Sequence, residues 1–363
     1  MLSGSQMRST VVLRVDPEQP DRQAIERAAA VIRRGGLVAF PTETVYGLGA
    51  DALNPEAVAR IFEAKGRPAH DPIIVHVADA DGLAGVAREV PAVAGRLAEM
   101  FWPGPLTLVV PKAQAVPAVV TAGGETVAVR CPAHNVALAL IRAAGTPIAA
   151  PSANRFGHTS PTAAQHVLED LDGRFELLLD GGPTPVGVES TVLDLTGRVP
   201  TILRPGGVTR EALEAVLGRV AVLERLPEGE TSPRSPGLLD RHYAPRATLW
   251  LFTGPRERVV AAIRREARRA RGGGRRVAAL VADEDVEEVA GEGILVSSVG
   301  PGHDVAGVAR RLFAVLRSLD AQHPDLILAR DFPREGLGLA VHDRLVRAAG
   351  RIIDVTAECS EGD

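Results

Sequence analysis

A stretch of 23 residues about two thirds of the way along the chain, RLPEGETSPRSPGLLDRHYAPRA (225–247), contains four prolines and two glycines. Proline removes a backbone donor and blocks the preceding helical turn, so this stretch cannot form the interior of a helix or of a central strand. The 363 residues therefore fold as separate parts on either side of it, in line with about 150 residues per domain. We predict a first domain over residues 1–218, a connector over 219–246 and a second domain over 247–363.

The first domain alternates short apolar runs with stretches of helical spacing. The runs predict strands at 11–15, 37–40, 73–77, 106–110, 127–130, 147–150, 175–179, 191–195 and 201–204. The helical spacing predicts helices at 21–34, 55–65, 81–89, 91–101, 134–144, 161–170 and 209–217. Residues 41–51 are too rich in Gly, Pro and Thr to be regular. The pattern predicts an α/β or α+β domain with many strands.

The second domain has a more regular alternation. Strands are expected at 248–252, 277–280, 294–298 and 325–329, and helices at 255–271, 283–290, 303–319 and 337–350. Strands separated by helices of this length favour a parallel sheet with crossover connections. The domain has a Rossmann-like pattern, but it lacks the GxGxxG turn that binds dinucleotides.

Charge and composition restrict the partners of this chain. The net charge is −4, the pI is about 6.2 and aromatic residues make up 3%, which together argue against nucleic acid as the principal ligand. Residues 256–276 hold nine arginines on an amphipathic helix. That pattern favours a solvated face and leaves a weak tRNA or partner contact as the alternative. No apolar run is long enough for a membrane span, and the first residues lack the apolar region of a signal peptide. Two distant cysteines, Cys131 and Cys359, indicate neither a disulfide framework nor a zinc site, so we expect a cytoplasmic protein.

Lysine is rare in this chain. Of 41 basic residues only Lys65 and Lys112 are lysine. A lysine that persists in such a sequence can be required as a compact ammonium on a flexible stem, which arginine does not reproduce. Chance is the alternative explanation for either residue.

Two segments in the first half of the chain carry polar groups at places where a strand or helix ends. FPTETVYGLGAD (40–51) puts hydroxyl groups, including that of Thr42, directly after a buried strand, where open sheets bind ligands. KGRP (65–68) and DPIIVH (71–76) place Lys65 and Arg67 at the end of a helix and His76 on an apolar strand. The alternatives are a Thr-rich turn, solvated cations at a helix C-terminus, and a core histidine.

Two later segments have the same character. PIAAPSANRFGHTSPT (147–162) offers Ser152 and Asn154 after a strand, and Ser160 as an N-cap before Pro161 at an anion-binding helix start. GVESTVLDL and ILRPGG place Ser190 at the start of one strand and Arg204 at the end of the next; Arg130 ends the strand VAVR. Arginines at strand ends suit carboxylates or phosphates. Capping alone would also explain Ser160.

The cations and hydroxyls of these four segments together indicate that the chain binds a polyanion and reacts it. We find no Ser-His-Asp set, no paired catalytic carboxylates and no metal-ligand cluster, so no metal site held by the protein is expected. Cations and hydroxyls around a cavity favour catalysis by positioning and charge stabilisation, as in nucleotide chemistry.

Seven segments occur in an order that resembles one family. FPTETVYGLGAD, KGRPAHDPIIVHV, FWPGPLTLVV, VAVRCP, APSANRFGHTSPT, ESTVLDL and ILRPGG together resemble the YrdC-like threonylcarbamoyl-AMP synthases. The connector SPGLLDRHYAP (235–245) is similar to the linker of the two-domain members. The resemblance covers about residues 12–355 and implies an α/β fold: a YrdC-like twisted open sheet around a large concave, electropositive cavity, followed by a smaller Rossmann-like domain.

The resemblance also implies roles for individual residues. Those implied to bind ATP are Lys65, Arg67, Ser152, Asn154, Ser160, Arg204 and Tyr243, with Lys65 and Arg67 also catalytic. Those implied to bind threonine are Thr42, His76, Arg130, Ala150 (through its backbone) and Ser190. The connector would act as a lid through Tyr243. Leu238, Leu239 and Asp240 depart from the usual SPGM pattern, which puts the contacts of the lid's first half in doubt.

The implied reaction converts L-threonine, bicarbonate and ATP to L-threonylcarbamoyl-AMP and pyrophosphate. The product would feed a downstream threonylcarbamoyl transferase complex that modifies tRNA. Mg²⁺ would accompany ATP, bound mostly by phosphates and water. Two alternatives remain open: a carbamoyltransferase of the same fold, and an RNA-binding module.

Overall fold

The computed structural model describes residues 9–223, 235–237, 242–291 and 293–356. The chain divides into two compact units: Met1–Phe156 with Ser160–Leu239, and Gly157–Thr159 with Asp240–Asp363. Much of the predicted connector, including Leu238, Leu239 and Asp240, lies outside the described residues. The predicted lid therefore stays a prediction.

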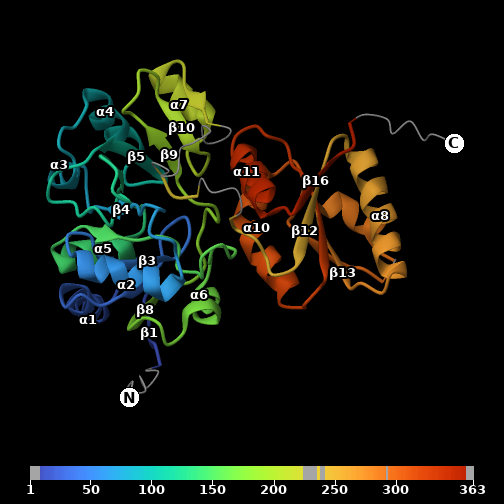
Figure 1. Cartoon of the computed structure of the whole chain (residues 1–363), viewed down its shortest axis with the longest axis horizontal. Helices are drawn as coiled ribbons and strands as arrows, with labels where there is room; N and C mark the ends of the chain where they lie inside the picture. The colour runs from blue at the N-terminus through green and yellow to red at the C-terminus, as the bar shows by residue number, and fades with distance from the viewer. Residues whose placement is uncertain (1–8, 224–234, 238–241, 292, 357–363) are drawn as a thin grey trace. The chain divides into compact units, whose positions relative to one another are not determined.

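The first unit contains a large, twisted, mixed sheet (Figure 1). Across the described residues its strand order is β1-β8-β2-β3-β7-β4-β6-β5-β9-β10-β11. The strands are β1 (Val11–Arg14), β2 (Val38–Phe40), β3 (Gly47–Asp51), β4 (Val75–His76), β5 (Leu106–Pro111), β6 (Thr126–Arg130), β7 (Ile148–Ala149), β8 (Leu177–Asp180), β9 (Thr191–Asp194), β10 (Thr201–Arg204) and β11 (Ala221–Val222). Parallel and antiparallel neighbours alternate irregularly: β5 pairs with β9 in parallel and with β6 antiparallel.

Helices pack on this sheet through apolar faces. They are α1 (Arg22–Arg33), α2 (Pro55–Lys65), α3 (Gly82–Val86), α4 (Ala92–Phe101), α5 (Asn135–Ala144), α6 (Ala164–Leu171) and α7 (Arg210–Leu217). α2 begins as the sequence predicts, because the Asn54 side chain accepts hydrogen bonds from the amides of Glu56 and Ala57. It ends at Gly66, whose left-handed φ of 63° turns the chain directly after Lys65.

The prediction that 41–51 is irregular is wrong for its second half. Residues Gly47–Asp51 form β3, which pairs antiparallel with β2. A Cβ atom on Gly49 would lie 2.7 Å from both the Phe40 ring and the Ile148 side chain. Glycine here lets two buried strands approach closely, so its low strand propensity is outweighed by packing.

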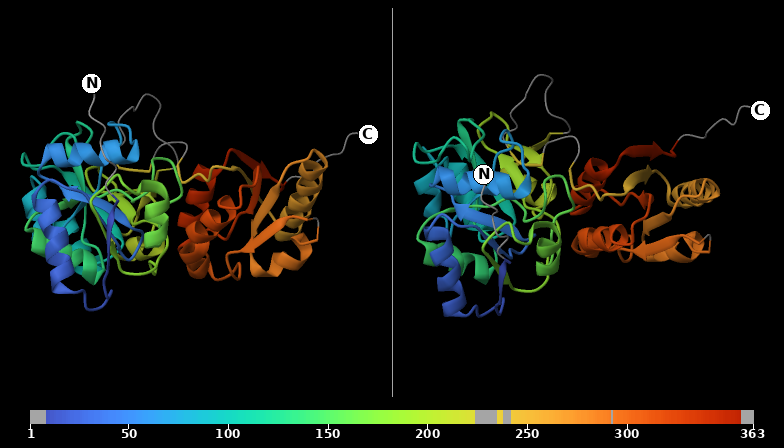
Figure 2. Two further views of the ribbon diagram at one scale, coloured as in Figure 1. Left: turned by 90° about the horizontal axis from the view of Figure 1, so that it is seen from below. Right: turned by 60° about the horizontal axis from the view of Figure 1, so that its bottom comes forward.

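The second unit is a parallel α/β sheet of order β14-β13-β15-β12-β16 in the described residues, which confirms the predicted alternation. Its strands are β12 (Thr248–Thr253), β13 (Val277–Val281), β14 (Leu295–Ser298), β15 (Leu326–Arg330) and β16 (Arg351–Asp354). Its helices are α8 (Arg256–Gly272), η1 (Asp283–Asp285), α9 (Val286–Val289), α10 (Val305–Asp320) and α11 (Gly338–Ala348). Within the unit, α8 covers one face of the sheet and α10 and α11 the other (Figures 1 and 2). The sequence analysis missed β11 and β16, both of which are short.

None of the helices in the described residues is both long and apolar enough to cross a membrane. Cys131 is a buried free thiol, and Cys359 lies outside the described part of the chain.

Candidate functional site

Backbone hydrogen bonds join two of the predicted segments, 40–51 and 147–162. The Leu48 amide donates to the Pro151 carbonyl (2.9 Å), and the Ala153 amide donates to the Tyr46 carbonyl (2.8 Å). The Tyr46 amide in turn donates to the Pro161 carbonyl (2.9 Å). The turns that follow β2 and β7 therefore lie against each other.

Lys65 is brought to these turns by α2. Its side chain is buried, and its ammonium donates to the carbonyl oxygens of Ser152 (2.6 Å) and Asn154. Carbonyl oxygens accept hydrogen bonds from the ammonium but carry no net charge to neutralise it. The structure therefore unites Lys65 with Ser152 and Asn154, three residues predicted to bind the nucleotide.

Arg67 is held next to Lys65 by a buried ion pair. Its guanidinium lies 2.9 Å from the Asp71 carboxylate and donates to the carbonyls of Asp71 (3.1 Å) and Pro72 (2.7 Å). Burial raises the pKa of the Asp71 carboxyl, while the charges of Arg67, Lys65, His70 and Arg204, in decreasing order, oppose that shift. All three candidate cations thus act electrostatically on this carboxylate.

Arg204 connects the nucleotide candidates to a threonine candidate. Its Nη2 donates to the Ser190 carbonyl (3.1 Å) and to the Ser190 hydroxyl oxygen (3.2 Å). Ser190 Oγ also lies 2.8 Å from the hydroxyl oxygen of Thr107, on β5. Ser190 and Arg204 come from adjacent positions because β9 and β10 pair antiparallel.

A second polar cluster contains the other threonine candidates. Arg130, at the end of β6, donates to the hydroxyl of Thr44 (2.9 Å) and forms an ion pair of 2.6 Å with Glu43. The Thr44 hydroxyl lies 2.8 Å from that of Thr42, which also bonds to the Val45 carbonyl (2.7 Å). Thr42 therefore shapes the turn after β2 and reaches Arg130 through Thr44.

His76 and Ala150 flank this cluster on neighbouring strands. His76 pairs with Arg130 in the β4–β6 register, and the Ala150 amide donates to the Ile74 carbonyl (2.9 Å). Burial, reinforced by the charge of Arg130, lowers the pKa of His76 to about 3, so its ring is neutral at physiological pH. A neutral His76 adds no charge to the cluster.

The predicted N-cap role of Ser160 is wrong. α6 begins at Ala164 after the cap position Ala163, and Ser160 Oγ donates instead to a carboxylate oxygen of Glu189. Ser160 is fully buried, so it needs this long-range acceptor. The bond still ties the 147–162 segment to the segment that carries Ser190.

Tyr243 belongs to the second unit. Its ring stacks on Phe313 at a centroid separation of 5.8 Å, and the Arg344 guanidinium lies 4.9 Å from the ring centroid. The side chain is buried and its backbone φ is +62°. These contacts describe its place within the second unit, and its predicted nucleotide role stays a prediction.

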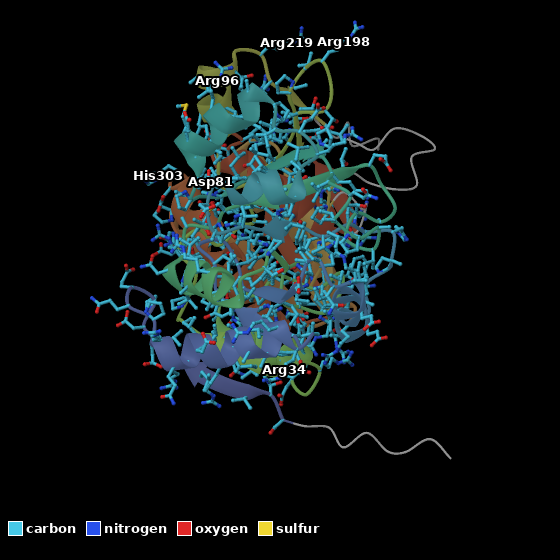
Figure 3. The ribbon with its side chains drawn as sticks, turned by 90° about the vertical axis from the view of Figure 1, so that its left-hand side faces the viewer. Arg34, Asp81, Arg96, Arg198, Arg219 and His303 are labelled. Carbon is cyan, nitrogen blue, oxygen red and sulfur yellow. The ribbon has the colours of Figure 1, made fainter. Side chains whose placement is uncertain are left out.

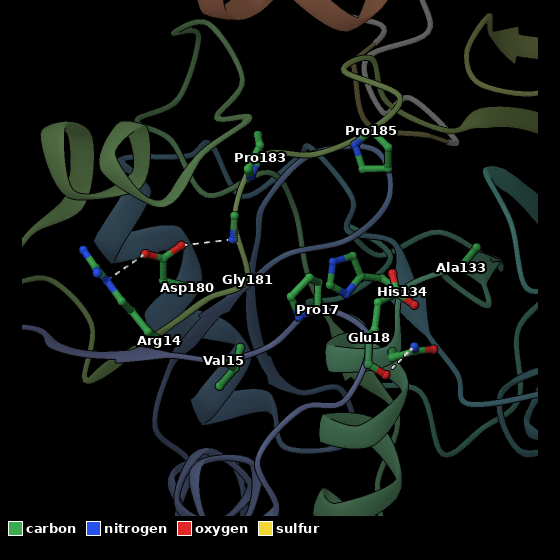
Figure 4. A pocket seen from close by; sticks show the side chains of 12 residues that line it. Arg14, Val15, Pro17, Glu18, Ala133, His134, Asp180, Gly181, Pro183 and Pro185 are labelled. Carbon is green, nitrogen blue, oxygen red and sulfur yellow. Dashed lines mark hydrogen bonds and ion pairs between the residues drawn. The ribbon is translucent and has the colours of Figure 1, made fainter.

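A cavity of about 620 Å³ opens in the first unit at the carboxyl ends of β1 and β8 (Figure 4). It is bordered by Asp180, whose carboxylate accepts from the Gly182 amide (3.1 Å), and by Asn135, which donates to the Glu18 carbonyl (2.9 Å). Tyr46 reaches its wall by donating to the Gly182 carbonyl (2.7 Å). None of the predicted site residues lines this cavity.

The candidate cations differ from the charged groups at the surface of the first unit. Arg34, Asp81 and Arg96 project from its surface (Figure 3). Lys65, Arg67 and Arg204, in contrast, are at most 7% exposed. Over the described residues no group of three or more His, Cys, Asp or Glu side chains has an arrangement that could hold a metal ion.

Known proteins share both the sequence and the fold of this chain. Residues 30–206 match a family described as telomere recombination, and residues 208–350 match one described as the threonylcarbamoyl-AMP synthase C-terminal domain. Threonylcarbamoyl-AMP synthases of Pyrococcus abyssi and Bacillus subtilis are 47% and 48% identical, covering 95% and 90% of this chain and 100% and 93% of their own.

The chain belongs to the threonylcarbamoyl-AMP synthase family. The crystal structure of Pyrococcus abyssi Sua5 complexed with L-threonine is similar as well, with a TM-score of 0.89 and 46% identity over 95% of this chain and 100% of that one.

The structure adds four polar residues of this threonylcarbamoyl-AMP synthase family member that sequence reasoning did not select. They all contact a predicted site residue, and they are Glu43, Asp71, Thr107 and Glu189. Each lies inside a segment that carried the family resemblance. Only Thr107 stands within an apolar run, where its hydroxyl was an available signal, and the partner of each residue depends on tertiary pairing.

Proposed function

We propose that this chain synthesises L-threonylcarbamoyl-AMP from L-threonine, bicarbonate and ATP, with release of pyrophosphate. One observation carries the proposal: Lys65, Arg67 and Arg204 are buried, their charges all act on the Asp71 carboxylate, and Arg204 bonds directly to Ser190. Such a concentration of positive charge fits a triphosphate. The names of the relatives supply the amino-acid part of the reaction.

The chemistry needs no covalent bond to the protein. The threonine amine attacks bicarbonate carbon, and loss of water leaves a carbamate. A carbamate oxygen then attacks the α-phosphorus of ATP, and pyrophosphate leaves as the phosphoanhydride bond breaks. A nucleotidyl transfer of this kind requires alignment, charge stabilisation and exclusion of water, because the carbamate reverts readily.

We assign the nucleotide to the side formed by Lys65, Arg67 and Arg204. Lys65 and Arg67 would stabilise charge on the reacting phosphate, and Arg204 would hold the pyrophosphate that leaves. Ser152 and Asn154 are assigned to the nucleotide on their contacts with Lys65. Ser160 is assigned on the family resemblance. Tyr243 is assigned on the family resemblance alone.

We assign threonine to the side formed by Arg130, Ser190 and the turn after β2. Arg130 is a donor fork for a carboxylate, although Glu43 offsets part of its charge. Thr42 and neutral His76 would contribute hydrogen bonds, and Ala150 its backbone. The Arg204–Ser190 bond places the two sides in contact.

Mg²⁺ enters this proposal as part of the substrate. A hard cation of this kind binds phosphate oxygens and keeps several waters. We further propose that the protein acts in the cytoplasm and passes its adenylate to a threonylcarbamoyl transferase complex that modifies tRNA.

Mass spectrometry of the reaction mixture tests the proposal. We expect a product with the mass of threonylcarbamoyl-AMP when L-threonine, bicarbonate and MgATP are all present, with one pyrophosphate per product. Omission of any one substrate should abolish both signals. Product formation from carbamoyl phosphate instead of bicarbonate, or pyrophosphate release without threonine, would contradict it.

A further inference from the structure

Thr107 is a polar residue at a position where packing calls for an apolar one. β5 reads LTLVVP, and Leu106, Leu108 and Val110 face the main core. Thr107 points to the opposite face with Val109, which packs in an apolar cluster with Val192 and others. Thr107 is fully buried. A buried hydroxyl among apolar side chains needs a hydrogen-bond partner to offset the loss of water.

Ser190 is that partner. The two hydroxyl oxygens are 2.8 Å apart, and either could be the donor by distance alone. Arg204 Nη2 donates to the same Ser190 oxygen at 3.2 Å. Three donors, two hydroxyls and one guanidinium N–H, therefore converge on two oxygens.

The surroundings of the two hydroxyls decide the direction of the Thr107–Ser190 bond. A hydroxyl has one proton and two acceptor positions, so Ser190 can accept from both Thr107 and Arg204. If Ser190 donated to Thr107, the Thr107 proton would have no acceptor among the described residues, on the strand face that Thr107 shares with the apolar Val109, and an unmet buried donor costs about 1–3 kcal/mol. If Thr107 donates instead, the Ser190 proton is the one without an acceptor among the described residues, and it lies where a ligand could supply one.

The unassigned proton lies beside Arg204, and Ser190 is fully buried. It is therefore costly until an acceptor arrives. An O–H donor next to a guanidinium favours an anionic oxygen, and a carboxylate is the acceptor that an amino acid offers. Among the described residues the Ser190 proton lacks an acceptor, and a substrate carboxylate would supply one.

We propose that Thr107 is a positioning residue that, by donating to Ser190, directs the Ser190 hydroxyl toward a carboxylate oxygen of the amino-acid substrate. The inference rests on the proposed function. Because Arg204 shares the same oxygen, the Arg204–Ser190–Thr107 chain also links the threonine side to the nucleotide side. Thr107 acts only through Ser190 and touches no reacting atom.

Substitution of Thr107 by valine gives the main test, since valine has the same shape and suits a strand. We expect Thr107→Val to fold and to raise the KM for threonine about tenfold, with a smaller change in kcat. Thr107→Ser restores the hydroxyl and should bring this KM back to within about threefold of the parent value. Thr184→Val is the matched control: Thr184 is buried and its hydroxyl makes no hydrogen bond among the described residues. Its KM should not change.

A substrate analogue distinguishes a positioning role of Thr107 from a general disruption of the site by the substitution. L-Threoninamide lacks the anionic carboxylate, so the unmodified protein should prefer threonine strongly. Thr107→Val should reduce that preference about tenfold, because threonine loses an interaction that the amide makes only weakly. An unchanged preference, or an unchanged KM for threonine, would overturn the proposal.

Calorimetric titration of threonine keeps this inference separate from the proposed function. If the unmodified protein neither binds threonine nor makes product, the proposed function fails. If it does both and Thr107→Val matches it, only the role of Thr107 fails. Should Thr107→Val not fold, Thr107→Ala takes its place with the same expected results and the same serine rescue.

Discussion

Both units bury arginine side chains, but they neutralise them differently. In the second unit the fully buried Asp285 lies 2.8 Å from Arg256 and 2.5 Å from Arg330. Arg256 also pairs with Glu288 (2.5 Å) and Arg330 with Glu284 (3.3 Å). Two arginines thus meet three carboxylates, and the cluster is complete without a ligand.

In the first unit the candidate cations are held differently. Lys65 donates to carbonyl oxygens, Arg204 donates to carbonyls and a hydroxyl, and Arg67 pairs with Asp71. The charges of all three act on the Asp71 carboxylate. An ion cluster that neutralises itself stabilises a fold, whereas buried cations held by carbonyl and hydroxyl oxygens suit an anion that arrives from outside. This difference favours the first unit as the place of the proposed function.

The largest effect is expected at Asp285. Asp285→Ala leaves the buried Arg330 and the half-buried Arg256 short of their common partner and should lower the free energy of unfolding by about 3–5 kcal/mol. The chain has one tryptophan in each unit, Trp102 and Trp250, so urea unfolding is followed by Trp250 fluorescence in a Trp102→Phe background. Asp283→Ala is the control, because Asp283 is exposed and its side chain accepts only from the Ser298 hydroxyl among the described residues. Equal effects of the two changes would contradict a structural role for the cluster.

The second-largest effect is expected at His76, whose ring must stay neutral for the comparison of charge between the two units to hold. Its pKa is about 3 in the folded chain and about 6.5 when unfolded, so the unfolded chain binds more protons between these values. Stability from this group is therefore complete above pH 6.5 and is lost as the pH falls toward 3. We expect a loss of about 2 kcal/mol by pH 5, measured by Trp102 fluorescence in a Trp250→Phe background. His76→Asn should flatten the pH dependence, and an unchanged slope would show that His76 does not cause it.

Substitution of Lys65 tests directly whether the buried cations of the first unit take part in the reaction. Lys65→Met removes one cation and should lower threonine-dependent pyrophosphate release at least about tenfold, since one charge contact in the transition state is worth about 1.4 kcal/mol or more. Lys65→Arg keeps the charge but not the geometry of the bonds to Ser152 and Asn154, so its loss should be intermediate. Lys112→Met is the control, because Lys112 is half-buried with its ammonium 3.4 Å from the Val116 carbonyl. Full activity of Lys65→Met would remove Lys65 from the catalytic group.

Much of this site could be predicted because its residues mark the ends of elements. Asn54 predicts the start of α2, and the helix then delivers Lys65 at its last turn. Arg130 and Arg204 each end an apolar run, and a change from apolar to charged residues indicates the end of a strand. The regular alternation of the second unit predicts a parallel sheet for the same reason.

The parts that escaped prediction depend on distant contacts. The sequence did not predict β3, because the close packing of Gly49 against Phe40 exists only in the folded hairpin. Ser160 precedes a proline as a cap would, yet its acceptor Glu189 lies 29 residues away. Thr107 is a β-branched residue in an apolar strand, so the sequence pattern alone does not indicate a role for its hydroxyl.

The smallest effect is expected on the basic face of α8. Arg269 on α8 and Arg275 just beyond its end are exposed, unlike the cations of either buried cluster. Replacing both with glutamine should change the free energy of unfolding by less than about 0.5 kcal/mol and leave product formation unaltered, because water already solvates them. Binding of tRNA, titrated with salt, should be weak and equal in the parent and the variant. A salt slope that falls by about 1 for each arginine removed would instead make this face a phosphate-binding surface, and positive charge in the second unit would then have a function of its own.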